Sequence, residues 1–243
     1  MITKQQMPND DIFNHPCGKC AHYEASVWQP VDRSGISVLT KGFSRKDFAE
    51  GEAVFEQDDQ NRGVFCVSKG LIGLRTLQAD GTSTLLRLAS PGEIIGFRSF
   101  LGGGRHQTEA RALVPSRVCI VAHRDADRVV QGNPSVLAKL ASRCISEIDR
   151  NHARIIASST TSNKKRLADL LLRLMNDHGE PIGDQLCMHL PLSRSDLASL
   201  IGVQPETMSR LVKRLEKDGF FAISGRDVRI PITQPKLRTA RAQ

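Results

Sequence analysis

One segment of the sequence, residues 205–217, carries polar side chains whose types and spacing suit contacts with DNA bases. In a helix, which turns about 100° per residue, Glu206, Ser209 and Arg210 share one face, and the opposite face is apolar. An arginine can donate to O6 and N7 of guanine, a carboxylate can accept from N4 of cytosine, and a serine hydroxyl can do either. The pattern predicts a recognition helix in which these three residues contact bases.

Cations near these residues predict contacts with the DNA backbone. Four basic residues lie on the same helix face or at the tip of the hairpin that follows it: Lys213, Arg214, Lys217 and Arg226. Phosphate contacts set affinity and its salt dependence without reading sequence. The alternative interpretation is an ordinary amphipathic helix whose charged face only meets solvent. Residues 160–243 carry 14 Lys and Arg against 9 Asp and Glu, which favours DNA binding.

Signals on both sides of this helix predict the elements that position it. Ser193 and Asp196 match a variant of the capping box, so a first helix begins there and ends at the next glycine. Pro205 suits the first turn of the second helix. Apolar residues at 220–223 and 228–230 flank a turn in the manner of a hairpin. The whole is expected to form a winged helix-turn-helix.

A β-rich region precedes these helices. Short apolar stretches recur between turn residues from about Phe43 to Val121. The Asp80-Gly81 pair predicts a hairpin, because both residues tolerate the positive φ that a tight turn needs. We expect a small antiparallel β-roll over residues 35–132.

A long helix with one apolar stripe follows the predicted roll. Pro134 suits its first turn, and apolar residues then recur mostly three, four or seven apart. The stripe comprises Leu137, Leu140, Cys144, Ile148 and Ile155. It can bury against its own domain or against the same helix of a second subunit, and the flanking charges favour the second subunit. Residues 133–160 are therefore expected to form a dimerisation helix and hinge.

The fold class expected from these elements is α+β, with an antiparallel β-roll, a long dimerisation helix and a winged helix-turn-helix in that order. A chain of 243 residues is long enough for two domains. Four segments are predicted: an arm with a Cys-x-x-Cys pair at 1–34, the roll at 35–132, the helix and hinge at 133–160, and the DNA-binding domain at 161–243.

Composition predicts a protein of the cytoplasm. The net charge is +8, and no apolar run approaches the roughly 18 residues that a membrane span needs. Residues 1–6 have no apolar core behind their charge, so they do not match a secretory signal. An enzyme is not expected. Cys17 with His15 or His22 could form a nucleophilic pair, but no phosphate loop, nucleophile elbow or paired carboxylate motif accompanies it.

The six cysteines offer a second kind of chemistry. Only Cys17 and Cys20 are closely spaced, and a disulfide framework is not expected in a reducing compartment. Thiolates at Cys-x-x-Cys spacing suit soft metals. Cys144 and Cys187 are instead expected to pack as small hydrophobes.

Residues 197–211, LASLIGVQPETMSRL, resemble the recognition motif of the CRP/FNR family of transcription regulators. The arrangement Glu206-x-x-Ser209-Arg210 resembles the FNR branch, and the likeness extends from about residue 40 to residue 232. It implies a homodimer on a TTGAT-like inverted repeat in double-stranded DNA, with half-sites about one helical turn apart. It also implies RNA polymerase as a partner, with either activation or repression as the outcome.

The same resemblance implies that the roll is similar to a cyclic-nucleotide-binding sensor domain. Such a site is expected to place a glutamate at the ribose and an arginine at the phosphate. Here Arg98 stands in the glutamate position and Gln107 stands near the arginine position, so the sequence argues against cAMP. Arg98 and Arg105 could hold another anion, and surface roles are the alternative.

For the FNR branch, the resemblance implies a [4Fe–4S] cluster bound by N-terminal cysteines and one cysteine of the roll. Cys17, Cys20 and Cys119 resemble three of those four ligands. The remaining N-terminal cysteine is expected near Ser26, where none occurs. The residues left to complete the set are His15, His22 and Cys66.

Three interpretations of the Cys-x-x-Cys pair stay open: a cluster that senses oxygen or nitric oxide, a thiol–disulfide switch or other metal site, and no sensory role. In the last case, an unidentified small molecule in the roll is the effector. A thiol-dependent redox or ligand-binding protein without DNA binding is the alternative of a different class.

Overall fold

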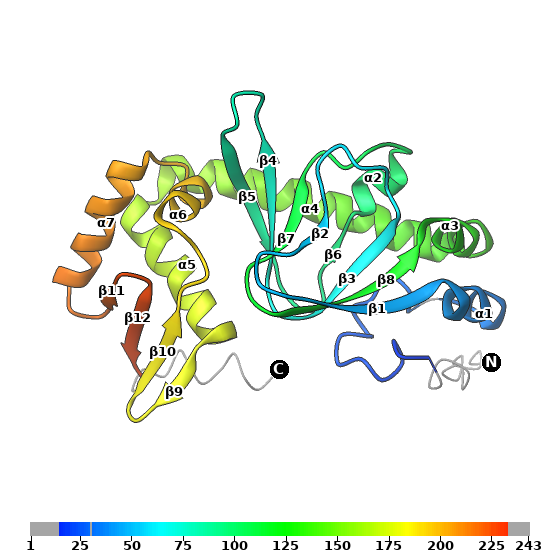
Figure 1. The fold of residues 1–243 in the computed structure, drawn as a ribbon, viewed down its shortest axis with the longest axis horizontal. Coiled ribbons are helices and arrows are strands. Elements are labelled where there is room, and N and C mark those ends of the chain that lie inside the picture. The colour runs from blue at the N-terminus through cyan, green and yellow to red at the C-terminus, as the bar shows by residue number, and fades with distance from the viewer. Residues whose placement is uncertain (1–14, 30, 233–243) are drawn as a thin grey trace, which may run out of the picture. The chain divides into compact units, whose positions relative to one another are not determined.

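The computed structural model describes residues 15–29 and 31–232 and confirms the expected α+β class. The chain divides into two compact units, Met1–Asp149 and Arg150–Gln243, and the division falls inside one long helix. The first unit contains the strands of the roll, and the second contains three shorter helices with a small sheet (Figure 1).

Two four-stranded antiparallel sheets form the roll of the first unit. One has the strand order β1-β8-β3-β6 and the other β2-β7-β4-β5. The strands are β1 (Phe43–Phe48), β2 (Ala53–Phe55), β3 (Gly63–Lys69), β4 (Ile72–Leu77), β5 (Ser83–Ala89), β6 (Ile94–Ile95), β7 (Glu109–Ala112) and β8 (Ser116–Ala122). Phe55, Phe65, Ile72 and Val118 belong to the apolar core that both sheets share. Removal of this apolar surface from water is the main force that holds the sheets together.

The hairpin predicted at Asp80-Gly81 joins β4 to β5. Gly81 has a φ of 82°, a conformation that is strained for residues with a side chain. The Asp80 carboxylate accepts a hydrogen bond from the Thr82 N–H (2.8 Å), and the Gln78 N–H donates to the Thr82 carbonyl (2.9 Å). The prediction of a turn at this pair is confirmed.

The face of the β1-β8-β3-β6 sheet that points away from the roll interior is covered by the N-terminal segment and by helices. The helices of this unit are α1 (Arg33–Gly42), α2 (Phe97–Leu101), α3 (His123–Gly132) and the first part of α4 (Pro134–Thr160). Trp28, Leu39, Val129 and Leu140 are fully buried in the apolar cluster formed there. His15 of the N-terminal segment, which is drawn in dark blue in Figure 1, packs against Phe43 of β1.

The sequence does not predict α1, which lies where the arm and the start of the roll are expected. Asp32 begins the helix, and its carboxylate accepts a hydrogen bond from the Gly35 N–H (2.8 Å). The Asp32 N–H in turn donates to Asn133 Oδ1 (3.1 Å), which lies 101 residues further along the chain. A short helix held mainly by tertiary contacts leaves little periodic signal in the sequence.

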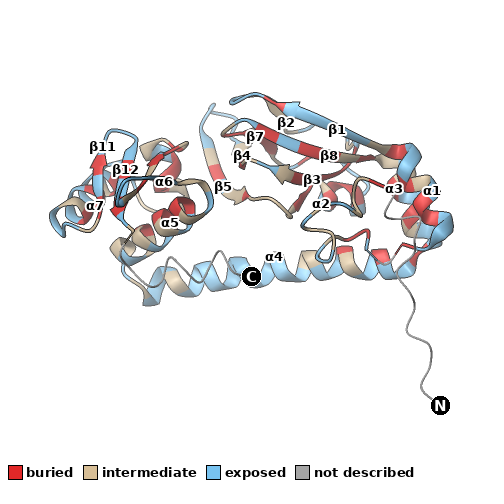
Figure 2. Ribbon diagram, turned by 90° about the horizontal axis from the view of Figure 1, so that it is seen from below, coloured by how far each residue is buried: buried red, intermediate tan, exposed pale blue. Residues whose placement is uncertain are grey.

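The apolar stripe predicted on α4 has two parts in the structure, one buried in its own chain and one exposed. Leu140 is fully buried in its own chain and Cys144 is partly buried against the same cluster, so Leu140 does not join an exposed seam. This corrects the expectation that Leu140 and Cys144 belong to one stripe that packs against a second subunit. The exposed apolar residues of the helix are Leu137, Ile145, Ile148, Ile155 and Ile156, and Figure 2 shows the helix pale blue over most of its length. Neither α4 nor any other described helix is long and apolar enough to cross a membrane.

The second unit places three helices against a small antiparallel sheet. The helices are α5 (Asn163–His178), α6 (Arg194–Ile201) and α7 (Pro205–Lys217). The sheet has the order β11-β12-β10-β9, with β9 (Glu180–Ile182), β10 (Gln185–His189), β11 (Ala222–Ser224) and β12 (Asp227–Pro231). The two helices of the predicted helix-turn-helix and the hairpin after them are confirmed, whereas β9 is not predicted by the sequence.

Candidate functional site

Helix α7 buries one face and leaves the opposite face exposed. The buried side chains are Met208, Leu211, Val212 and Leu215. They face a module in which α7 packs against α5 and α6. The exposed side chains include all six residues of this helix that the sequence predicts at DNA: Glu206, Ser209, Arg210, Lys213, Arg214 and Lys217. The structure therefore brings these six residues together on one surface.

The polar face of α7 is free to engage a charged partner. None of its six predicted side chains forms an ion pair with another residue in the described part of the chain. The Ser209 hydroxyl donates to the Pro205 carbonyl (3.1 Å), so its acceptor lone pairs face outward. Unpaired cations beside hydrogen-bonding groups are the arrangement that a nucleic acid binds.

The turn before α7 has the chemistry that the sequence predicts. The Asp196 N–H donates to the Ser193 hydroxyl (3.0 Å) and the Ser193 N–H donates to Asp196 Oδ2 (2.9 Å), which completes the capping box. At the other end of α6, Gly202 has a φ of 74° and its N–H donates to the Ala198 carbonyl (2.8 Å). Pro205 then occupies the first turn of α7. The end of α6 and the start of α7 are therefore both fixed by residues of the connection itself.

Two arginines that the sequence analysis did not single out hold the C-terminal end of α6. Arg166 of α5 donates to the Ile201 carbonyl (2.7 Å), and Arg154 of α4 donates to the Leu200 carbonyl (3.2 Å). The last turn of a helix leaves its carbonyls without partners, and positive charge is favourable there. Burial lowers the pKa of Arg154, and the charges of Arg166 and Arg173 lower it further. These contacts span 35 and 46 residues, so no local sequence pattern reveals them.

The hairpin after α7 forms the wing. Gly225 and Arg226 make the turn between β11 and β12, and Arg226 is exposed as the sequence predicts. Arg194, at the start of α6, donates to the Gly225 carbonyl (3.1 Å), and the Leu190 N–H donates to the Arg226 carbonyl (2.7 Å). The wing tip is therefore tied to the same module as α7.

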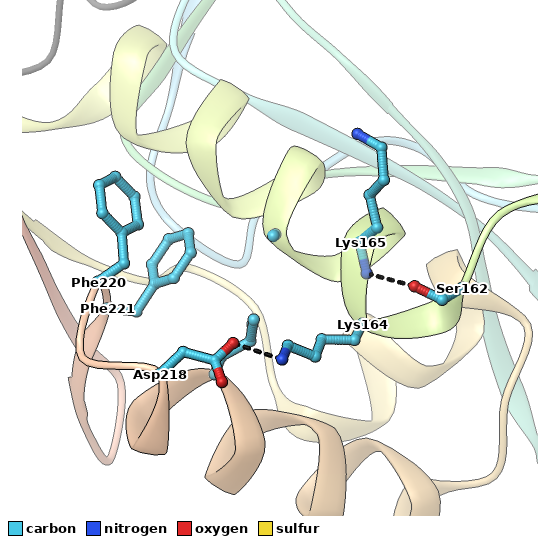
Figure 3. Close-up of a pocket in the computed structure, with 8 residues that line it drawn as sticks. Ser162, Lys164, Lys165, Asp218, Phe220 and Phe221 are labelled. Atoms are coloured by element: carbon cyan, nitrogen blue, oxygen red, sulfur yellow. Dashed lines mark hydrogen bonds and ion pairs between the residues drawn. The ribbon is translucent and has the colours of Figure 1, made fainter.

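A pocket of the second unit lies between the start of α5 and the end of α7 (Figure 3). The rings of Phe220 and Phe221 form one side of it, and an ion pair joins Lys164 to Asp218. The Lys165 N–H donates to the Ser162 hydroxyl (3.3 Å), which begins α5. None of the residues predicted at DNA lines this pocket, so it is separate from the predicted contact face.

The first unit brings the predicted cysteines together with a further one. Cys66 on β3 lies directly opposite Cys119 on β8, and Cys119 lies opposite Arg45 on β1. Directly opposed residues on antiparallel strands project to the same side of a sheet. This side is the one that the N-terminal segment covers, because Cys66 packs against the cluster that contains Trp28.

The Cys-x-x-Cys pair forms a turn anchored on β1. The Cys20 N–H donates to the Cys17 carbonyl (3.0 Å), and the Cys17 N–H donates to His15 Nδ1 (3.1 Å). The His15 ring packs edge-on against Phe43, with 4.8 Å between ring centroids. Ser26, where the resemblance expects a cysteine, instead accepts a hydrogen bond from the Trp28 N–H (3.2 Å).

The thiols lie close enough to interact electrostatically. Burial raises the pKa of Cys17 to about 12, with negative charge on Cys119 and Cys20 contributing and Arg45 opposing. Burial also raises the pKa of Cys66, and negative charge on Cys17, Cys119 and Cys20 raises it further. At neutral pH these two thiols therefore keep their protons, which they must release to bind a metal.

Two buried polar atoms beside the thiols have no hydrogen-bond partner. These are the indole nitrogen Nε1 of Trp28 and the imidazole nitrogen Nε2 of His15. Over the described ranges, no group of three or more His, Cys, Asp or Glu side chains is arranged to hold a metal ion. Thiols with unpartnered N–H groups nearby have the chemistry that an iron–sulfur cluster uses, since its sulfurs accept N–H hydrogen bonds.

Two domain families match the chain in the order of the two units. The cyclic nucleotide-binding domain matches residues 45–133, and the Crp-like helix-turn-helix domain matches residues 165–236. The nitrogen fixation regulation protein FixK of Bradyrhizobium diazoefficiens is 27% identical, over 86% of this chain and 87% of its own. The fumarate and nitrate reduction regulatory protein of Escherichia coli is 24% identical, over 76% of this chain and 74% of its own. The chain belongs to the CRP/FNR family.

This CRP/FNR protein is a DNA-binding transcription regulator, as its relatives are, and not an enzyme. Its fold agrees with the solved structure of FixK2 from Bradyrhizobium japonicum. That comparison has a TM-score of 0.64 at 22% identity, over 81% of this chain and 96% of that chain. The transcriptional regulatory protein btr of Bordetella pertussis is also similar, at 28% identity over 91% of both chains.

The roll of this CRP/FNR regulator differs from a cyclic-nucleotide site where the sequence indicates. Arg98, at the expected glutamate position, is exposed on α2, and Gln107 is exposed as well. Between them, His106 is buried and stacks on Phe55 at 3.7 Å between ring centroids. Its Nδ1 lies 2.9 Å from the Ser99 hydroxyl. Neither predicted position therefore presents its side chain to the roll interior.

Replacement of Ser193 by alanine tests whether the capping box at the start of α6 stabilises the protein. We expect Ser193→Ala to lower the free energy of unfolding by about 0.5–2 kcal/mol, because one side of the capping box is lost. Ser199→Ala is the matched control, since the Ser199 hydroxyl only donates to the Ser195 carbonyl within the helix (3.0 Å). Urea denaturation followed by circular dichroism measures both. Equal effects of the two substitutions would contradict the capping role.

Proposed function

We propose that this regulator acts in the cytoplasm as a homodimer on a TTGAT-like inverted repeat, in partnership with RNA polymerase. Its DNA binding responds to oxygen, nitric oxide or redox state through the N-terminal cysteine group. The observation that carries the DNA half of the proposal is the exposed polar face of α7. The observation that carries the sensory half is the convergence of cysteines under the N-terminal segment.

The recognition helix combines two kinds of contact. Glu206, Ser209 and Arg210 lie in its first half, which a helix-turn-helix inserts toward base edges. The cations proposed to contact phosphates are Lys213, Arg214 and Lys217, with Arg226 from the wing. Base contacts give specificity, and phosphate contacts give affinity that falls with salt.

The exposed residues of α4 support a symmetric dimer. Ile145, Ile148 and Ile155 are 60%, 52% and 67% exposed, and they follow one another at intervals of three and seven. This is the spacing of a coiled-coil seam, in which an identical helix covers the apolar residues. A two-fold dimer presents two recognition helices related by the same axis, and its natural target is an inverted repeat.

The N-terminal segment connects the cysteine group to the dimer helix. Lys139 of α4 donates to the Ser26 carbonyl (3.3 Å) and to Gln29 Oε1 (2.9 Å). Arg143 of α4 donates to the Ala25 carbonyl. A [4Fe–4S] cluster on Cys17, Cys20 and Cys119 would supply sensitivity to oxidants. The chain's own part is to hold residues 15–29 against α4 while the thiolates are ligated.

Specific DNA binding is tested by Arg210→Ala. We expect this change to weaken binding to the inverted repeat by about 1–3 kcal/mol per half-site and to leave binding to unrelated DNA nearly unchanged. Lys213→Ala, the matched control, is expected to weaken both and to reduce the salt slope by about 1, because it loses a phosphate contact. Fluorescence anisotropy at several salt concentrations measures both constants. Equal loss on both DNAs for Arg210→Ala would remove its role in base reading.

Metal analysis of protein purified without oxygen tests the sensory half. We expect iron and acid-labile sulfide in equal amounts, with visible absorption that fades in air. Cys20→Ala is expected to lose all three signals, whereas Cys187→Ala, a partly buried cysteine of β10, keeps them. A wild-type chain that contains neither iron nor visible absorption contradicts the cluster.

A further inference from the structure

We propose that Cys66 is the fourth sulfur ligand of the sensor site, which binds one polynuclear iron–sulfur cluster. The four ligands are Cys17, Cys20, Cys66 and Cys119. The inference rests on the proposed function, in which the cysteine group carries the signal. It assigns two ligands to the N-terminal segment and two to neighbouring strands of one sheet.

The strand register fixes the first pair of ligands. Cys66 and Cys119 are directly opposed on β3 and β8. Such a pair has Cβ atoms about 4.5–5.5 Å apart on the same side of the sheet, so both sulfurs can reach one centre without backbone movement. Arg45 lies opposite Cys119 on β1 and adds a positive charge beside an anionic cluster.

The contacts of His15 place the second pair over the same side of the sheet. Its ring meets Phe43, and Phe43 and Arg45 project to the same side because they are two residues apart in a strand. Cys17 follows directly, since its N–H donates to His15 Nδ1 (3.1 Å). Cys17 and Cys66 also pack against the same apolar cluster.

Zinc and iron–sulfur centres both take thiolate ligands, and the metal and sulfide contents measured below separate the two. Among the described residues, no group of three or more His, Cys, Asp or Glu side chains is arranged to hold a metal ion. The thiols still interact, because negative charge on Cys17 or Cys119 adds to burial in raising the pKa of Cys66. Four thiolates around a larger centre are the ligand set of a [4Fe–4S] cluster.

The two histidines that the sequence leaves as alternatives make contacts that Cys66 does not. His15 uses Nδ1 to accept the Cys17 N–H and packs its ring against Phe43. His22 lies against Gly92, because a Cβ atom added to Gly92 would stand 3.0 Å from His22 Nδ1. Cys66 differs from both because it lies directly opposite Cys119 on the neighbouring strand and packs against the same apolar cluster as Cys17.

Trp28 adds a hydrogen-bond donor to the site. Its indole nitrogen is buried without a hydrogen-bond partner. Trp28 belongs to the apolar cluster against which Cys66 packs, so the indole lies near this sulfur. A buried N–H without an acceptor costs free energy, and a ligating thiolate supplies that acceptor.

The ligand assignment is tested by Cys66→Ser, which preserves the size of the side chain. The matched control is Cys144→Ser, because Cys144 packs against the same cluster while its own electrostatic neighbours are Glu147 and Arg98. In full-length protein purified without oxygen, we expect about four iron and four sulfide per chain for wild type and control. For Cys66→Ser we expect less than about one of each, with circular dichroism and dimer size unchanged.

Each outcome of this experiment separates the inference from the proposed function. Wild-type levels of iron in Cys66→Ser overturn the role of Cys66 while the cluster stands. Stoichiometric zinc without sulfide in wild type overturns the cluster itself. A wild type without any metal overturns both the inference and the sensory half of the proposed function.

Trp28→Phe tests the donor separately from ligation. We expect the iron and sulfide content to remain at the wild-type level, because no ligand is removed. The reduction potential of the cluster is expected to become more negative, since an N–H bond to a ligating sulfur favours the more negative reduced state. A redox titration followed by visible absorption measures the shift. An unchanged potential would show that the indole does not donate to the site.

Discussion

The burial of Trp28 against the outer side of the β1-β8-β3-β6 sheet is the contact on which the arrangement of the first unit depends. The indole is completely buried among Val64 of β3, Val121 of β8 and Leu140 of α4. Residues 15–29 have turns but no helix or strand, so no ladder of backbone hydrogen bonds holds them. A side chain of this size supplies much of the apolar area that keeps an irregular segment in place.

The DNA-binding unit depends instead on hydrogen bonds to the free backbone groups at the two ends of α6. α6 is closed at its start by Ser193 and Asp196 and at its end by two distant arginines. Because both ends are fixed, the short helix serves as a rigid support for the buried side of α7. The side chains on the outer face of α7 can then remain unpaired without loss of order in the module.

The sequence predicts features that are encoded locally and misses those created by folding. The capping box at Ser193 and Asp196 and the hairpin at Gly81 depend on neighbouring residues, and both are predicted. The contact of Arg166 with α6 and the opposition of Cys66 to Cys119 depend on pairings across 35 and 53 residues, which periodicity does not record. The division of the α4 stripe was missed for the same reason. An apolar residue such as Leu140 has the same pattern whether its own core or a second subunit buries it.

Arg154 belongs to α4, yet it donates its hydrogen bond to α6. The last turns of α4 therefore belong to the same compact unit as α6 and α7. In the proposed dimer, a rotation of the two α4 helices about each other would turn each module together with its own helix. Such a rotation would change the separation of the two recognition helices without any movement inside either module. The half-site spacing that the proposed dimer accepts would then depend on the angle between the two α4 helices.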